Sequence, residues 1–143
     1  MARVLIVPCG GRGQALAREL VEAGHAVRGT TRDPDRTAAI AAAGAEPYVG
    51  DPDRIGTLMG ALAGVTIVVW LMGAIEDPNL HDGRLRMLFE KLVDTPVRGV
   101  VYEGAVATGE AIARDAADRW QIPVRMLAPG GDARGAVDEL LGL

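Results

Sequence analysis

Short apolar runs alternate with amphipathic stretches along this chain, and the alternation limits what the chain can fold into. Residues 3–7 are almost entirely apolar, which is typical of a strand buried on both faces of a sheet. Residues 13–23 place Leu16 and Leu20 on one face and charged side chains on the other, as an amphipathic helix does. Gly24 follows at the point where that helix would end. A strand followed by a helix is the repeating unit of parallel α/β folds.

The same unit recurs through the rest of the chain. We expect strands at residues 3–7, 26–30, 46–49, 65–71, 98–102 and 124–127, and helices at residues 13–23, 34–43, 53–62, 80–93, 105–120 and 133–141. Helical crossovers between parallel strands are right-handed and cover both faces of the sheet. The sequence therefore predicts an α/β, three-layer αβα fold with a doubly wound six-stranded parallel sheet. A Rossmann-like strand order, 3-2-1-4-5-6, is favoured, and a flavodoxin-like order is the alternative.

The composition removes several classes of function. The 143 residues contain no serine, one lysine (Lys91, outside any glycine loop) and one cysteine (Cys9). A serine hydrolase triad, a P-loop lysine and an intramolecular disulfide are therefore not expected. Potential metal ligands do not cluster at a usable spacing, so we predict no metal site. The length predicts one domain, residues 1–143.

Charge and hydropathy limit the expected partners. A net charge of −4 argues against nucleic-acid binding, which relies on a cationic surface. No run approaches the ~18 apolar residues of a membrane helix, and the N-terminus lacks the features of a signal peptide. We therefore expect a cytoplasmic protein that binds neither nucleic acid nor membranes.

The densest glycine cluster is Gly10, Gly11 and Gly13, between the first expected strand and the first expected helix. In a doubly wound sheet, ligands bind outside the carboxyl ends of the strands where the strand order reverses. Glycine lets the backbone turn sharply and lets a diphosphate approach the amides, and the helix N-terminus supplies unpaired N–H groups. The cluster predicts a dinucleotide site, and a plain strand-to-helix turn is the alternative.

The end of the second expected strand indicates which dinucleotide binds. A carboxylate there binds the ribose 2′-hydroxyl of NAD, whereas an arginine accommodates the 2′-phosphate of NADP. The chain has Thr31 and Arg32 at this point, and Arg32 offers a planar, permanently charged guanidinium. We expect Arg12 and Arg36 to converge on the same spot, and the alternative is that all three arginines are solvated surface residues. The combination favours NADP over NAD as the cofactor.

Five segments also carry a resemblance to a known family. They are Val4-Leu5-Ile6-Val7, Gly10-Gly11-Arg12-Gly13, Gly24-His25-Ala26-Val27-Arg28, Thr31-Arg32-Asp33-Pro34 and Gly50-Asp51. Together they resemble the first half of the atypical and extended short-chain dehydrogenase/reductase superfamily, whose members share a Rossmann fold and bind NAD(P).

This resemblance implies roles for particular residues. Gly10 and Gly13 would line the diphosphate, Arg32 would hold the 2′-phosphate, and Asp51 would contact the adenine amino group. Trp70-Leu71-Met72-Gly73 resembles the family segment that passes under the nicotinamide-side ribose. The expected cofactor-binding residues are therefore Gly10, Gly11, Arg12, Gly13, Thr31, Arg32, Asp51, Met72 and Gly73.

The chain departs from the family pattern in two places. Val7 occupies the position of the first of the three glycines that the family usually has. The family also uses a serine, a tyrosine and a lysine four residues after the tyrosine, which lowers the tyrosine pKa. This chain has no serine, and Met87 lies four residues before Lys91. The standard dehydrogenase mechanism of the family is therefore not expected.

Two other side chains are candidates for acid–base chemistry. Glu103 follows the fifth expected strand, and His81 opens the helix after the fourth, so both would lie at the ligand edge of the sheet. The alternatives are charge compensation at a helix N-terminus for Glu103 and a solvated helix residue for His81. Cys9 is expected to be a small buried filler of the glycine turn rather than a nucleophile.

Three functions follow from these features. The first is an NAD(P)-binding protein without the standard catalysis, acting as a nucleotide sensor or with a partner. The second is a small NADP-dependent oxidoreductase or epimerase-like enzyme that uses Glu103 or His81. The third is an assembly module that keeps the fold without the nucleotide. No small-molecule substrate is predicted, and the amphipathic last helix could pack on the sheet or on a second copy, which leaves a homodimer open.

Overall fold

The computed structural model describes residues 2–72, 83–104 and 107–142. The strands are β1 (Arg3–Val7), β2 (Ala26–Thr31), β3 (Glu46–Val49), β4 (Ile67–Leu71), β5 (Gly99–Glu103) and β6 (Val124–Leu127). The helices are α1 (Gly11–Glu22), α2 (Thr37–Ala42), α3 (Gly83–Leu92), α4 (Ala107–Trp120) and α5 (Ala133–Leu140). Three short 3₁₀ helices complete the described elements: η1 (Pro34–Arg36), η2 (Ile55–Leu58) and η3 (Gly60–Leu62).

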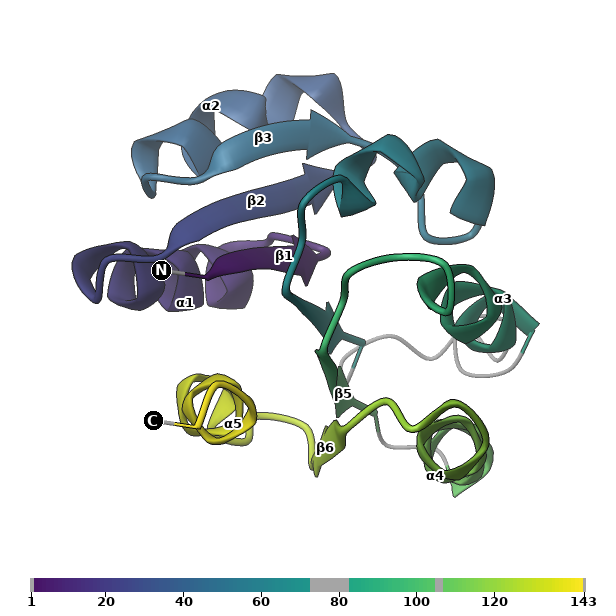
Figure 1. Cartoon of the computed structure of the whole chain (residues 1–143). Helices are drawn as coiled ribbons and strands as arrows, with labels where there is room; N and C mark the ends of the chain where they lie inside the picture. The colour runs from purple at the N-terminus through teal and green to yellow at the C-terminus, as the bar shows by residue number, and fades with distance from the viewer. Residues whose placement is uncertain (1, 73–82, 105–106, 143) are drawn as a thin grey trace.

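The strands form one parallel sheet in the order β3-β2-β1-β4-β5-β6 (Figure 1). Val4 of β1 lies opposite Val27 of β2 on one side and Ile67 of β4 on the other. The strand order therefore reverses between β1 and β4, and this point is where open α/β sheets bind ligands. The predicted doubly wound sheet and its order are confirmed, and the flavodoxin-like alternative is excluded.

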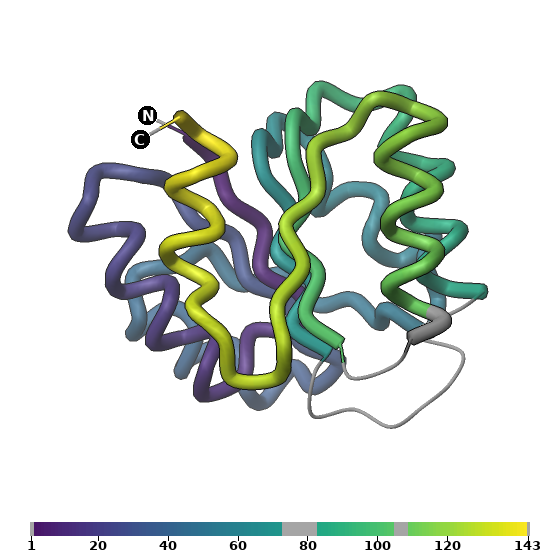
Figure 2. Tube along the Cα trace, turned by 90° about the horizontal axis from the view of Figure 1, so that it is seen from below, coloured from purple at the N-terminus to yellow at the C-terminus, as the bar shows by residue number. Residues whose placement is uncertain are grey.

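Helices cover both faces of the sheet, which explains why its strands are apolar on both sides. On one face α1 and α5 lie side by side, while α3 and α4 lie on the opposite face (Figures 1 and 2). The core under α1, α2 and α5 includes Val4, Ile6, Leu20, Ile40 and Val137. The core under η2, η3, α3 and α4 includes Leu58, Trp70, Leu88, Phe89 and Tyr102. In the described part of the chain no helix has the length and apolar character needed to cross a membrane.

The prediction of an α-helix at residues 53–62 is wrong, because this segment forms the two short 3₁₀ helices η2 and η3. Gly56 and Gly60 disfavour an α-helix, and a Cβ at Gly60 would overlap the Tyr48 hydroxyl. The predicted helix at residues 34–43 likewise begins as the 3₁₀ helix η1 before α2. Strand β5 runs one residue further than predicted and includes Glu103.

Candidate nucleotide-binding site

A cavity of about 880 Å³ lies at the carboxyl ends of β1, β2 and β3. Its volume is within the range of small-molecule sites, roughly 300–1,000 Å³. The end of β2 and the segments that follow the three strands supply the lining: Pro8, Cys9 and Gly10; Thr30, Thr31, Arg32, Asp33, Pro34 and Arg36; and Gly50, Asp51, Pro52 and Asp53. The cavity therefore lies beside the glycine turn, and Gly10 is the residue of the turn that lines it.

The glycine turn leaves the start of α1 open toward this cavity. Gly10 is the N-cap residue and no side chain caps the helix. The first hydrogen bond of the helix runs from the Gln14 amide to the Gly10 carbonyl, at 2.8 Å, so the preceding amides have no intrahelical partner. A Cβ built at Gly10 or Gly11 would meet no atom within 4 Å. Open space above unpaired amides at a helix N-terminus is suited to a phosphate group.

Gly13 has a different role from Gly10 and Gly11. A Cβ at Gly13 would lie 3.0 Å from Ile6 Cγ2 and 3.1 Å from the Pro8 carbonyl oxygen. This glycine lets α1 pack closely on β1, which is the role of the last glycine in dinucleotide-binding turns. The expectation that Gly13 lines the diphosphate remains untested, and its contacts with β1 account for a glycine at this position.

Cys9 lies beneath the glycine turn and is almost completely buried. Its amide donates to the Thr30 carbonyl at 2.8 Å, which links the end of β1 to β2. Desolvation by burial raises the pKa of the Cys9 thiol to about 11. The thiol is therefore neutral at neutral pH, and Cys9 is a packing residue as predicted.

Alkaline pH is expected to destabilise the fold through Cys9. An unfolded thiol with the ordinary pKa of 9.0 ionises earlier than the folded thiol, whose pKa is about 11. The folded state then binds more protons, so stability falls as pH rises. Between pH 8 and pH 10 the free energy of unfolding should fall by about 1 kcal/mol for this reason. Urea unfolding at both pH values, in the wild type and in Cys9→Ala, measures it; equal pH dependence in the two proteins would contradict the assignment.

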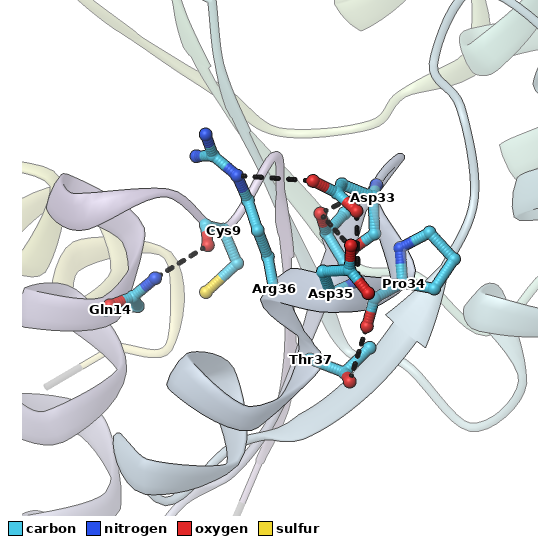
Figure 3. A network of polar contacts seen from close by, with 8 residues as sticks. Cys9, Gln14, Asp33, Pro34, Asp35, Arg36 and Thr37 are labelled. Atoms are coloured by element: carbon cyan, nitrogen blue, oxygen red, sulfur yellow. Dashed lines mark hydrogen bonds and ion pairs between the residues drawn. The ribbon is translucent and has the colours of Figure 1, made fainter.

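The loop after β2 is shaped by its own polar groups. The Thr31 hydroxyl accepts from the Asp33 amide at 3.1 Å and donates to the Asp33 carbonyl at 3.2 Å. The Asp33 carboxylate accepts from the Asp35 amide at 2.9 Å and pairs with Arg36 at 3.8 Å. Figure 3 shows the Arg36 side chain rising between the Cys9 turn and Asp33. The Thr31 hydroxyl thus holds the loop through two hydrogen bonds to the Asp33 backbone, and Arg32 lies in the same loop.

Arg32 is exposed and lines the cavity. No ion pair of Arg32 occurs within residues 2–72, 83–104 and 107–142. Its neighbour Arg36 also lines the cavity but is paired with Asp33. Arg32 is therefore the cationic side chain of this loop that is available to an anionic ligand.

The loop after β3 also lines the cavity. The Gly50 amide donates to the Thr31 carbonyl at 2.9 Å, which holds this loop against the end of β2. The Asp51 carboxylate accepts from the Asp53 amide at 2.9 Å, and Asp53 pairs with Arg84 of α3 at 3.1 Å. Asp51 thus faces the cavity from a loop that is braced on two sides.

Thr30 is a cavity residue that the sequence analysis missed. Its hydroxyl oxygen is buried and has no hydrogen-bond partner in the described structure, although the residue lines the cavity. Buried polar atoms are nearly always satisfied, so an orphaned one calls for a partner such as water or ligand. In the sequence, nothing distinguishes Thr30 from its neighbour Thr31 at the end of the same strand.

Arg12 pairs with Glu103 and is not among the described residues that line the cavity with Arg32 and Arg36, so the expected convergence of the three arginines is not found in the described structure. The Arg12 guanidinium forms a bidentate ion pair with Glu103, in which Nη1 donates to Oε1 at 2.6 Å and Nη2 donates to Oε2. The Gly130 amide donates to the same Oε2 at 3.1 Å. Glu103 is 0% exposed whereas the Arg12 side chain is 48% exposed. The hydrogen bond to Glu103 raises the pKa of Arg12 further above its already high value.

Met72, another predicted cofactor-binding residue, directly follows β4. Met72 is completely buried, and its amide donates to the Glu103 carbonyl at 3.1 Å. Gly73 and His81 lie outside the described residues. No group of three or more His, Cys, Asp or Glu side chains in the described ranges could hold a metal ion.

A doubly wound sheet with a glycine turn and an open helix N-terminus at its switch point defines a nucleotide-binding protein of the Rossmann class. A family model described as NAD(P)H-binding matches residues 9–141. The chain belongs to this NAD(P)H-binding family, and its fold is that of the short-chain dehydrogenases/reductases. No curated protein matches the chain.

Solved structures with the same fold include proteins crystallised with either nucleotide. A short-chain dehydrogenase/reductase superfamily protein from Agrobacterium tumefaciens with bound NAD is 18% identical, with a TM-score of 0.69 over 88% of this chain and 48% of its own. Triphenylmethane reductase from Citrobacter sp., complexed with NADP(H), is also 18% identical, with a TM-score of 0.68 over 89% of this chain and 49% of its own.

UDP-glucuronic acid 4-epimerase from Bacillus cereus is 14% identical, with a TM-score of 0.71 over 90% of this chain and 56% of its own. This chain therefore spans about half the length of these three proteins. Identities this low establish the shared fold.

Proposed function

We propose that the chain binds NADP(H) in the cavity at the ends of β1, β2 and β3, in preference to NAD(H). The observation that carries this proposal is Arg32, an exposed arginine in the cavity lining immediately after β2 that forms no ion pair with any described residue. The ribose 2′ substituent of a bound dinucleotide lies at this position in Rossmann folds, where an arginine favours a phosphate over a hydroxyl.

The other cavity residues fit the rest of the adenosine half. The first amides of α1, which have no partner within the helix, would hold the phosphate next to the adenosine ribose, since open space lies over Gly10 and Gly11. Asp51 would accept a hydrogen bond from the adenine amino group. The orphaned hydroxyl of Thr30 would gain a partner from the ligand or from a water that the ligand orders.

We further propose that the chain lacks the standard catalysis of its family and acts as a nucleotide sensor or with a partner. A bound NADP would supply hydride transfer, but the family's serine is missing from the sequence. Tyr102 packs in the core beneath α3 and α4, and burial raises the pKa of Tyr102 to about 12. A tyrosine with a raised pKa is poorly suited to proton transfer near neutral pH.

Thermal unfolding in the presence of each nucleotide tests the proposal. NADPH at about 100 times its Kd should stabilise the fold by about 2.7 kcal/mol, which corresponds to a rise in Tm of roughly 10 °C for a domain of this size. NADH at the same concentration should give a clearly smaller rise. Equal shifts with both nucleotides would refute the NADP preference, and no shift with either would refute nucleotide binding itself.

A further inference from the structure

A second cavity, of about 380 Å³, lies at the amino ends of β5 and β6, on the edge of the sheet opposite to the proposed nucleotide site. The end of α3 and the segment before β5 supply one part of its lining, and the end of α4 and the segment before β6 supply the other. These segments meet because α3 and α4 pack against each other on one face of the sheet (Figure 1). The volume lies at the lower end of the range of small-molecule sites, roughly 300–1,000 Å³, so the cavity has room for one small ligand.

Apolar side chains from both parts line this cavity. Val97 and Ile122 are buried, Trp120 is half-buried, and Val93 is 48% exposed. A ligand with an apolar body would cover the exposed surface of Trp120 and Val93. Burial of apolar surface favours binding, and an aromatic ring offers a large flat contact area.

Arg98 places a cation beside these apolar side chains. It directly precedes β5, is exposed and lines the cavity. Within residues 2–72, 83–104 and 107–142 its guanidinium forms no ion pair and no hydrogen bond, and the described lining contains no carboxylate. The planar set of N–H donors on Arg98 is therefore available to a ligand.

The ends of α3 and α4 do not account for Arg98. The C-terminal end of a helix carries a partial negative charge that a nearby cation stabilises. Each helix has its own basic residue in the last turn, Lys91 in α3 and Arg119 in α4. The Arg119 guanidinium also lies 5.8 Å from the centroid of the Trp120 ring, within the range of a cation–π contact. Arg98 is thus a further cation at this edge.

Carbonyl groups at the two helix ends already have donors. The Leu92 carbonyl accepts from the Thr95 amide at 3.0 Å and from the Thr95 hydroxyl at 2.8 Å. The Asp118 carbonyl accepts from Nε2 of Gln121 at 2.7 Å. Because these acceptors are in use, the polar group that the cavity offers to a ligand is the donor set of Arg98.

We propose that this cavity binds a small amphipathic carboxylate. The carboxylate would pair with the Arg98 guanidinium, whose planar fork matches both carboxylate oxygens, and the apolar body would lie against Trp120 and Val93. This ligand site is separate from the proposed nucleotide site and does not depend on it.

Titration calorimetry with three probes of one chain length tests the proposal on the wild-type chain: octanoate, 1-octanol and octylammonium. Octanoate should bind about tenfold more tightly than 1-octanol, because it adds a charged hydrogen-bonded pair to the same apolar contact. Octylammonium should bind more weakly than 1-octanol, since its charge is repelled by Arg98.

Tryptophan fluorescence shows whether the probe lies in this cavity. The chain has two tryptophans, of which Trp70 is completely buried and Trp120 lines the cavity. Octanoate should change the emission of the wild type and leave that of Trp120→Phe unchanged, because only Trp70 remains to emit in the variant.

Arg98→Gln removes the charge at an exposed position. Its affinity for octanoate should fall about tenfold, to that of 1-octanol, and its affinity for 1-octanol should stay the same. The matched control is Arg114→Gln, an exposed arginine of α4 outside the described lining, which should leave both affinities unchanged.

Four results would overturn the proposal. They are octylammonium binding as tightly as octanoate, equal octanoate affinity in the wild type and Arg98→Gln, displacement of octanoate by NADPH, and no binding of octanoate at all. Displacement by NADPH would place octanoate in the nucleotide cavity instead. None of these results bears on the preference for NADPH, which the thermal unfolding experiment decides. The wild-type comparison of the three probes stands even if a variant does not fold.

Discussion

Replacing Arg32 with glutamate is expected to weaken NADPH binding by roughly 10- to 100-fold and to abolish the preference for NADPH over NADH. Hydrogen bonds to charged groups contribute roughly 1.5–3 kcal/mol, and tenfold in affinity corresponds to about 1.4 kcal/mol. The Arg32 guanidinium is exposed at the cavity and has no ion-pair partner in the described ranges. Its loss would therefore remove the proposed ligand contact without breaking an ion pair of the described structure, and the new carboxylate would repel a 2′-phosphate.

Calorimetric titration of NADPH and NADH into Arg32→Glu and Arg32→Lys measures this effect. The lysine variant keeps the charge but loses the planar fork, so its NADPH affinity should fall between those of the wild type and the glutamate variant. Arg18→Glu, an exposed change on α1 outside the cavity lining, controls for the altered net charge. If Arg32→Glu retains the preference for NADPH, the assignment of Arg32 to the 2′-phosphate is wrong.

The same substitution at two glycines should separate binding from stability. Gly10→Val places a branched side chain in the open space above the start of α1, and we expect NADPH affinity to fall more than about tenfold because the amides there become blocked. Gly10 has a φ of −81°, which other residues adopt. The loss of a glycine N-cap should lower the free energy of unfolding by only about 0.5–1 kcal/mol.

Gly29→Val should have the opposite profile. A Cβ at Gly29 would lie 2.6 Å from both Cβ and Sγ of Cys9 and 3.1 Å from Ile40 Cγ2 of α2. Overpacking of this kind costs about 1–3 kcal/mol, and Tm should fall by roughly 4–12 °C. Thermal unfolding and NADPH titration of both variants measure the contrast. Equal losses of Tm in the two variants would show that Gly10 is a structural glycine and not part of the ligand site.

The strands of the sheet could be predicted because they are specified by short runs of consecutive apolar residues. Residues 3–7 and 67–71 are apolar at consecutive positions, and only a strand covered on both faces buries such a run. The segment at residues 53–62 was predicted less well, since its apolar spacing fits a helix while Gly56 and Gly60 weaken one. The contact between Gly60 and Tyr48 that accommodates η3 joins segments that the pattern does not relate.

The candidate site was predicted in part for the same reason. Gly10, Thr31, Arg32 and Asp51 lie at or just after the ends of three successive strands, and parallel strands bring their carboxyl ends to one edge. The partner of Arg12 could not be predicted, because Glu103 is 91 positions away in the chain. Thr30 and Thr31 also look alike in the sequence, and only the alternation of side chains across β2 decides which hydroxyl shapes the loop and which is left without a partner.

By itself, the sequence determined that this chain is a parallel α/β protein with a glycine turn at the switch point and an arginine after the second strand. These features depend on residue type and spacing, which act over a few positions along the chain. Only the tertiary structure decided that Arg32 faces the cavity while Arg12 is held by a buried glutamate across the end of β4. Side chains that can reach two sites take the one where burial and charge pairing are most favourable, and that comparison exists only once distant strands lie side by side.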